Sequence, residues 1–215
     1  MMPVIILADI SGSMSKEGKI ETLNRAIAEL IASLAEEDVR ADIHVAVVTF
    51  GKGGAKIHQP LLPASQIQWT DMEALGVTPM AAAFELAASI VEDRNQIPSR
   101  AYHPTIVLVS DGHPTDERGY ISDNWKEPLR QLVTSTRASK ALRLSMGIGA
   151  DADDEVLKEF LTGQHPEIPV FRADEAGQIR QFFCWVTMTV TSRSKSANPD
   201  STPIVDYDNL EDLDF

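Results

Sequence analysis

Short, continuously apolar runs alternate along this chain with segments in which apolar residues recur at helical spacing. The first run covers residues 4–8, and helical spacing follows over residues 20–34. A continuous apolar run is typical of a strand that is buried on both faces, whereas a recurrence every three or four residues indicates an amphipathic helix. The alternation therefore predicts parallel strands that are joined by crossover helices.

The same alternation continues to about residue 189. We expect further strands at residues 43–50, 105–109, 142–148 and 169–171, and further helices at residues 78–91, 125–139, 153–161 and 175–189. Three glycines, Gly51, Gly53 and Gly54, lead into the short segment 56–62. So tight a return predicts a hairpin, which places one antiparallel strand at the edge of the sheet.

Two segments carry more local expectations. Thr78 and Pro79 suit the N-cap and the first position of the helix that they precede. In the strand at residues 142–148, Arg143 and Ser145 alternate with apolar residues. That alternation predicts a strand with one wetter face.

The complete pattern predicts an α/β fold of the Rossmann-like, doubly wound kind. Its sheet has six strands and is mostly parallel, with one short antiparallel edge strand and helices on both faces. We assign residues 1–191 to this domain. From Ser192 the composition shifts to Ser, Asn, Asp and Pro without periodicity, which predicts a disordered acidic tail over residues 192–215. Apolar residues interleave with the acids of that tail, so we weigh a segment that orders on binding against a plain solubility feature.

The charge and the N-terminal segment restrict the partners and the compartment. A formal net charge of −13 repels phosphate backbones and anionic lipids, so neither nucleic acid nor membrane insertion is expected. The first apolar run has no basic flank and ends at Asp9, which is too short for a signal peptide or a membrane span. We expect a cytoplasmic protein.

Five oxygen-bearing side chains follow predicted strands or precede a predicted helix at one edge of the sheet. Asp9, Ser11 and Ser13 come after the first strand, Thr78 lies before a helix, and Asp111 follows the strand at 105–109. Ligands of open α/β sheets bind beyond the carboxyl ends of the strands, where such loops converge. Taken singly, each of these residues is more typical of a helix cap than of a metal ligand. Together they predict one site of hard oxygen donors, which suits Mg²⁺ or Mn²⁺.

The sequences D-I-S-G-S, G-V-T-P and S-D-G-H-P-T-D resemble the metal-ion-dependent adhesion site of von Willebrand factor A domains, in the right order and spacing over residues 3–191. The resemblance implies that Ser11, Ser13 and Thr78 coordinate the ion through their hydroxyls, while Asp9 and Asp111 act largely through water. It also implies that an Asp or Glu of a protein partner completes the coordination. We therefore expect a binding module and not an enzyme.

A narrower resemblance is to short bacterial A-domain proteins of the tellurite-resistance, or TerY-like, group. The shared features are a domain that starts near residue 1, the sequence D-I-S-G-S-M, and the sequence I-G-A-D-A-D after a strand. The resemblance implies a stress-response role and a partnership with a protein kinase and a protein phosphatase.

Two enzyme-like patterns compete with this interpretation. Residues 147–152 match G-x-G-x-x-A, with Asp174 further on, as in dinucleotide-binding folds. The helix after this pattern begins with Asp153, Asp154 and Glu155, where a pyrophosphate would have to bind, so we reject it. The stronger rival is a Mg²⁺-dependent phosphohydrolase that uses Asp9 as its nucleophile. Such enzymes usually place a general acid two residues later, and Ser11 has no suitable pKa for that role.

Overall fold

The computed structural model describes residues 1–36, 41–164, 168–202 and 204–205. Its single sheet has the strand order β3-β2-β1-β4-β5-β6. The strands are β1 (Met2–Asp9), β2 (Ile43–Gly51), β3 (Gly54–Pro63), β4 (Thr105–Ser110), β5 (Leu142–Ile148) and β6 (Val170–Ala173). Five strands run parallel and β3 runs antiparallel to β2, which confirms the predicted fold class.

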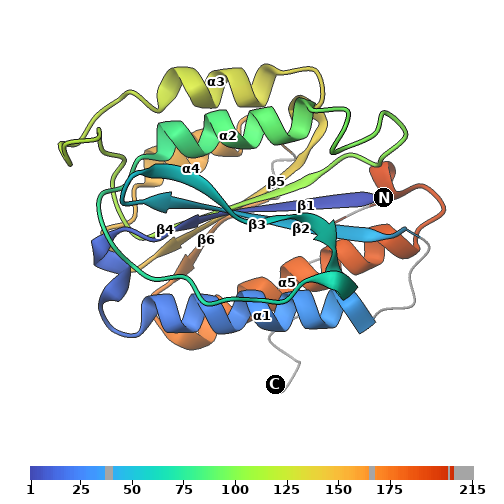
Figure 1. Cartoon of the computed structure of the whole chain (residues 1–215), viewed down its shortest axis with the longest axis horizontal. Coiled ribbons are helices and arrows are strands. Elements are labelled where there is room, and N and C mark those ends of the chain that lie inside the picture. The colour runs from blue at the N-terminus through green and yellow to red at the C-terminus, as the bar shows by residue number, and fades with distance from the viewer. Residues whose placement is uncertain (37–40, 165–167, 203, 206–215) are drawn as a thin grey trace.

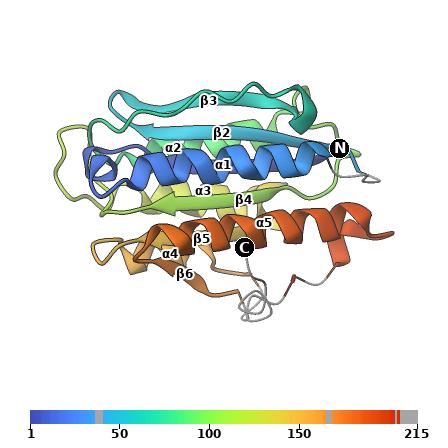
Figure 2. The same ribbon diagram turned by 90° about the horizontal axis from the view of Figure 1, so that it is seen from below.

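Helices cover both faces of this sheet. They are α1 (Lys19–Glu36), α2 (Met80–Glu92), α3 (Lys126–Thr134), α4 (Asp154–Phe160) and α5 (Ala176–Lys195). Figure 1 shows α2, α3 and α4 above the sheet and α1 and α5 below it, and in Figure 2 α1 and α5 lie side by side over the lower face. No helix among the described residues is long and apolar enough to cross a membrane.

The central strand β1 contributes to two hydrophobic cores at once. Val4, Ile6 and Ala8 pack under α1 and α5, whereas Ile5 and Leu7 pack under α2, α3 and α4. Every residue of β1 is buried, as the continuous apolar run predicts. β1 pairs in parallel with β2 on one side and β4 on the other, so the carboxyl ends of all three strands lie at the same edge.

The predicted hairpin is confirmed at the opposite flank of β2. Gly53 and Gly54 both have positive φ angles, 84° and 95°, and they turn the chain from β2 into β3. Glycine adopts such angles without the clash that a Cβ would cause. The antiparallel strand therefore forms the sheet edge, as expected, but with ten residues it is not the short strand that the sequence predicted.

Three helix boundaries differ from the prediction. The expectation that Thr78 caps α2 is wrong, because α2 begins at Met80, Pro79 occupies the N-cap position, and no side chain caps the helix. α3 ends at Thr134 and not near residue 139, because Ser135 is extended. α5 continues past Thr189 to Lys195, and its last turns are held by the buried Arg193, which donates to the Thr105 hydroxyl and to two carbonyls.

The start of the expected tail is partly ordered. A 3-10 turn covers Pro199–Ser201, Ile204 and Val205 pack against the core, and the indole N–H of Trp185 donates to the Val205 carbonyl at 2.7 Å. Residues 203 and 206–215 lie outside the described residues, so the disordered acidic tail stays a prediction there.

The prediction of a wetter face on β5 is wrong. Arg143 and Ser145 are 1% and 0% exposed, although both are polar. The Arg143 guanidinium donates to the carbonyls of Phe160, the last residue of α4, of Thr162 just beyond it, and of Ala138, which begins the 3-10 turn after α3. This buried cation thus replaces water as a donor to carbonyls at the C-terminal end of α4, and it is a second donor to the Ala138 carbonyl, which also accepts the N–H of Ala141.

Replacing Arg143 by Met should lower the free energy of unfolding by about 3 kcal/mol, because three carbonyls each lose the hydrogen bond from the guanidinium while the apolar stem is kept. Arg130→Met is the matched control, since Arg130 is exposed and pairs with Glu127 one turn away on the surface. Urea unfolding of both variants measures the difference. Equal stability of the two variants would contradict the role assigned to Arg143.

Candidate metal centre

Asp9 ends β1 and is completely buried. Its Oδ1 accepts the backbone N–H of Ser11 at 2.7 Å, which turns the chain sharply out of the strand. Its Oδ2 accepts the hydroxyl of Ser110, at the end of β4, at 2.6 Å. Both carboxylate oxygens are therefore held in place by two neighbouring strands. Ser110 is not among the five predicted site residues, although its place directly before Asp111 is a usable signal.

A chain of hydroxyls connects the first loop to Asp111. After Ser11, a 3-10 turn (Gly12–Ser15) brings Ser13 back toward β4, and the buried Met14 anchors that turn in the core. The Ser11 and Ser13 hydroxyls lie 3.0 Å apart, and the Ser13 hydroxyl donates to Asp111 Oδ1 at 2.6 Å. Four of the five predicted residues therefore form one connected group.

Backbone contacts carry the loop before α2 to the same edge. Gly12 N–H donates to the Gly76 carbonyl at 2.9 Å, and Leu75 N–H donates to the Ile10 carbonyl at 2.6 Å. Gly76 has φ 99°, and a Cβ on it would lie 2.4 Å from the Lys52 nitrogen, so only glycine fits there. This loop is fixed to the loop after β1 without the help of side chains.

Thr78 lies at the end of that loop and is 5% exposed. Its backbone N–H and carbonyl both bond to Thr115, which leaves the side chain out of these contacts. A Cβ on Gly112 would lie 3.8 Å from Thr78 Oγ1, so the hydroxyl faces the residue directly after Asp111. The structure thus brings all five predicted residues to one edge, with Thr78 beside the connected group and not bonded into it.

Lys19, which the sequence analysis did not consider, also reaches this edge. It is the first residue of α1, and its Nζ lies 2.8 Å from Asp111 Oδ2. The Asp111 side chain is completely buried, so this ammonium is the cation that balances it.

Burial raises the pKa of Asp9 to about 6, because a carboxylate loses its hydration in this position. The hydroxyl of Ser110 and the contacts of Ser11 lower the pKa and so oppose the effect, and the charge of Asp111 adds to it. A bound cation would lower the free-energy cost of burying two carboxylates at the same edge of the sheet.

The donors suit a hard cation. Within the described part of the chain, no group of three or more His, Cys, Asp or Glu residues is arranged to hold a metal ion. Any metal at this edge therefore depends on the hydroxyls of Ser11, Ser13 and Thr78 together with two carboxylates. An all-oxygen set of this kind is typical of Mg²⁺ and Mn²⁺ sites.

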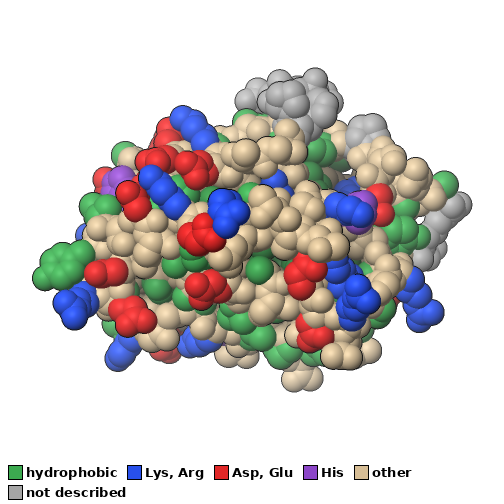
Figure 3. Space-filling view, turned by 90° about the horizontal axis from the view of Figure 1, so that it is seen from above, with side chains coloured by type: hydrophobic (Ala, Val, Ile, Leu, Met, Phe, Trp, Pro, Cys, Tyr) green, Lys and Arg blue, Asp and Glu red, His purple; other side chains and the backbone are tan. Residues whose placement is uncertain are grey.

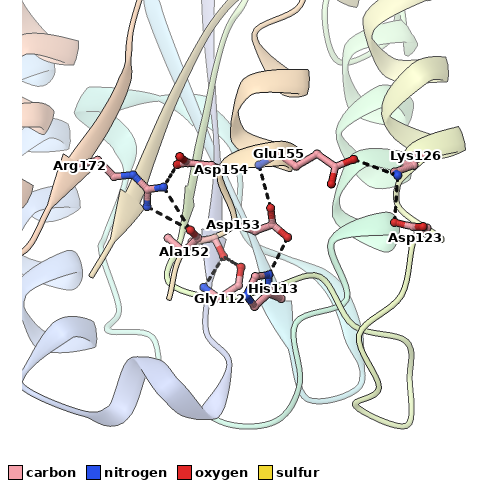
Figure 4. A network of polar contacts seen from close by, with 10 residues as sticks. Gly112, His113, Asp123, Lys126, Ala152, Asp153, Asp154, Glu155 and Arg172 are labelled. Carbon is pink, nitrogen blue, oxygen red and sulfur yellow. Dashed lines mark hydrogen bonds and ion pairs between the residues drawn. The ribbon is translucent and has the colours of Figure 1, made fainter. Parts of the chain in front are cut away.

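A second polar network borders the edge and explains the glycine pattern at residues 147–152. His113 Nδ1 lies 2.8 Å from Asp153, whose other oxygen caps α4 by accepting the Glu155 N–H (Figure 4). The N-terminus of α4 thus binds its own carboxylate and not a pyrophosphate. Gly147 is needed for packing, because a Cβ there would lie 2.9 Å from the Cβ of Ala152.

The structure is thus a doubly wound α/β domain that carries an oxygen-rich group at the carboxyl edge of its sheet. The chain belongs to the von Willebrand factor type A domain family, whose sequence pattern matches residues 4–113, just over half of its length. None of the curated proteins compared with the chain matches it.

Solved structures share the fold at low sequence identity. The pilus adhesin SpaC from Lactobacillus rhamnosus GG superposes with a TM-score of 0.73 at 15% identity, which covers 90% of this chain and 31% of the adhesin. A von Willebrand factor type A protein from Catenulispora acidiphila gives 0.61 at 18% identity, covering 89% and 42%. Proximal thread matrix protein 1 from the mussel byssus, with a zinc-occupied adhesion motif, gives 0.62 at 15% identity, covering 86% and 44%. This chain spans less than half the length of each of them.

Asp9→Asn should stabilise the metal-free protein at neutral pH by up to about 3 kcal/mol, because it removes a carboxylate whose pKa rises from 3.8 to about 6 on folding. The sign follows from proton binding. The folded state keeps its proton between these two pH values while the unfolded chain loses it, so wild-type stability falls across this window and then levels off. Unfolding in EDTA at pH 4 and pH 7 measures the effect. A gain of the same size at both pH values would contradict it.

Proposed function

We propose that this domain is a metal-ion-dependent protein-binding module that captures an acidic side chain of a partner through a bound divalent cation. The observation that carries the proposal is the connected group Asp9, Ser11, Ser13 and Asp111 with Thr78 on the same edge. These five residues would hold Mg²⁺ or Mn²⁺. The bound metal would supply a positive charge to which a carboxylate from outside can bind.

The mixture of donors explains why an outside ligand is needed. Three of the five donors are neutral hydroxyls, and both carboxylates are already hydrogen-bonded within the protein. A divalent cation at this edge keeps part of its charge unneutralised, and a hard cation accepts further oxygen ligands. An Asp or Glu side chain is the protein group that meets both demands.

The surroundings of the site favour a protein partner over a small anion. Leu75, Tyr120 and Ile121 are 54%, 70% and 75% exposed. Leu75 lies three residues before Thr78, and the bridge between Thr115 and Ile121 closes the loop of Tyr120 and Ile121, which Thr115 joins to Thr78. Figure 3 shows hydrophobic side chains projecting at the left end of the molecule, where the loops after β1 and β4 lie in Figure 1. Exposed large apolar side chains around a polar site are typical of interaction surfaces.

We propose further that the chain is not an enzyme. The rival, a Mg²⁺-dependent phosphohydrolase, needs an accessible nucleophile at Asp9, but that side chain is completely buried and both its oxygens accept hydrogen bonds. The residue two positions later is Ser11, which cannot protonate a leaving group at neutral pH. No feature of the edge compensates for these two defects.

The comparisons support the choice of class. Domains of this family commonly bind a metal at the adhesion site in order to bind proteins, and one fold relative is a pilus adhesin while another holds zinc at the motif. From the resemblance to the TerY-like group, we propose a cytoplasmic bacterial partner in a kinase and phosphatase signalling system of stress or tellurite resistance.

Asp111→Ala should abolish the binding of Mn²⁺ or Mg²⁺ and leave the chain folded. The variant removes the carboxylate that joins the serine hydroxyls to β4, at an edge outside both hydrophobic cores. Calorimetric titration measures the metal, and circular dichroism checks the fold. Asp116→Ala is the matched control, because Asp116 lies on the same connection but bonds to its own loop. Unchanged metal affinity in Asp111→Ala would refute the site.

Thr78→Val should reduce the amount of partner captured from the native cell extract far more than it reduces metal affinity, because the hydroxyl that faces the cation is lost while the shape is kept. Stability should change little, since Thr78 caps no helix. Pull-down with and without EDTA, quantified by mass spectrometry, compares wild type, Thr78→Val and Thr78→Ser. Thr78→Ser keeps the hydroxyl and should behave as wild type. If the wild type captures equal amounts of partner with and without EDTA, the metal-dependent mechanism is contradicted.

A further inference from the structure

Lys19 is placed at the metal edge by an unusual turn. The turn from Lys16 to Lys19 is closed by a hydrogen bond from Lys19 N–H to the Lys16 carbonyl at 3.1 Å. Glu17 and Gly18 inside it both have left-handed backbone, with φ 56° and 69°, and Glu17 is the only described residue other than glycine with a positive φ. An L-residue in this region costs about 1–2 kcal/mol. This strained turn sets the start of α1 at Lys19.

A lysine in this position does not help the helix. The N-terminus of a helix carries partial positive charge, so acidic residues stabilise the first turn and basic residues oppose it. Lys19 is nevertheless the first residue of α1, followed two positions later by Glu21. What favours a cation here is the carboxylate of Asp111 and not the helix.

The ammonium is also well confined. The Lys19 side chain is 16% exposed and its Nζ lies beside Gly149, where a Cβ would come within 3.5 Å. Asp111 Oδ2 accepts from Lys19 while Oδ1 accepts from Ser13, so both oxygens of this proposed ligand are engaged. A metal that draws on Asp111 must therefore share it with a cation that already belongs to the protein.

We propose that Lys19 is an internal counter-ion of the metal site, which weakens the binding of the metal alone and strengthens the binding of a partner's carboxylate to the metal-loaded site. The inference rests on the proposed function. With Asp9 and Asp111 ionised, these two carboxylates and Lys19 together carry one net negative charge. A divalent cation brings the edge to one positive charge, and a partner carboxylate then brings it to neutrality.

Without Lys19, the affinities of the edge for the metal and for the partner's carboxylate change in opposite directions. Two carboxylates and one divalent cation are already neutral, so a further carboxylate would leave the edge negative. The cation would bind more tightly by itself, and the partner would gain less from it. Lys19 thereby lowers the affinity of the edge for the metal alone and raises the affinity of the metal-loaded edge for the acidic partner, so a given concentration of carboxylate strengthens metal binding more when Lys19 is present.

The test is calorimetric titration of Mn²⁺ into four proteins: wild type, Lys19→Met, Lys19→Arg and Lys16→Met. Lys19→Met should bind Mn²⁺ about tenfold more tightly than wild type, a coupling within the usual range between interacting sites. Lys19→Arg keeps the charge and should stay within about twofold of wild type. Lys16→Met removes an exposed lysine three residues earlier and should bind as wild type does.

Sodium acetate serves as the probe for a carboxylate. It should raise Mn²⁺ affinity in wild type and raise it less in Lys19→Met, after correction for acetate–Mn²⁺ association in buffer. Thermal unfolding in EDTA supplies a readout independent of the metal: Lys19→Met should melt below wild type, because the buried Asp111 loses its counter-ion.

The outcomes separate this inference from the proposed function. Equal Mn²⁺ affinity of wild type and Lys19→Met overturns the counter-ion role and leaves the metal site standing. Tightening in Lys19→Arg as large as in Lys19→Met overturns it too, because charge would then not be the cause. Absence of Mn²⁺ binding in all four proteins overturns the proposed function and this inference together.

Discussion

The parallel pairing of β1 with both β2 and β4 is the constraint on which the rest of the molecule depends. It aligns the ends of three strands, so that Ala8 lies opposite Val109 and the next residues, Asp9 and Ser110, are hydrogen-bonded neighbours. Asp111 follows Ser110 directly at the same edge. Burial of β1 on both faces fixes that register, because a slip by one residue would exchange the two cores. The polar edge is thus a product of apolar packing.

The same packing buries two carboxylates at this edge, which costs electrostatic free energy. Asp9 is carried into complete burial as the last residue of a core strand, and the hydroxyl of Ser110 and the N–H of Ser11 replace only part of its hydration. Asp111 is balanced by a lysine that stands at an unfavourable end of its helix. Sites that bind ligands often conflict with local stability in this way. A cation from outside would relieve the conflict that the fold creates.

The sequence was sufficient for the mostly parallel sheet, the edge hairpin and the convergence of the five oxygen-bearing residues, because each depends on periodicity and on strand ends. It was not sufficient where distant segments meet. Arg143 appeared to mark a wet face, but its partners are carbonyls of other elements. Thr78 had the composition of a cap, but contacts with Thr115 place it outside the helix. Lys19 approaches Asp111 across 92 residues, and no local pattern predicts such a pair.

Because of Gly76, the backbone position of residue 78 does not depend on which side chain residue 78 carries. Backbone hydrogen bonds of its loop, and a contact too close for any Cβ, determine where residue 78 stands, and the threonine side chain takes no part in them. A substitution at residue 78 would therefore change the side chain without moving the backbone that carries it. Substitutions at this position, in evolution or by design, can therefore change the chemistry of this edge without altering the structure of the loop.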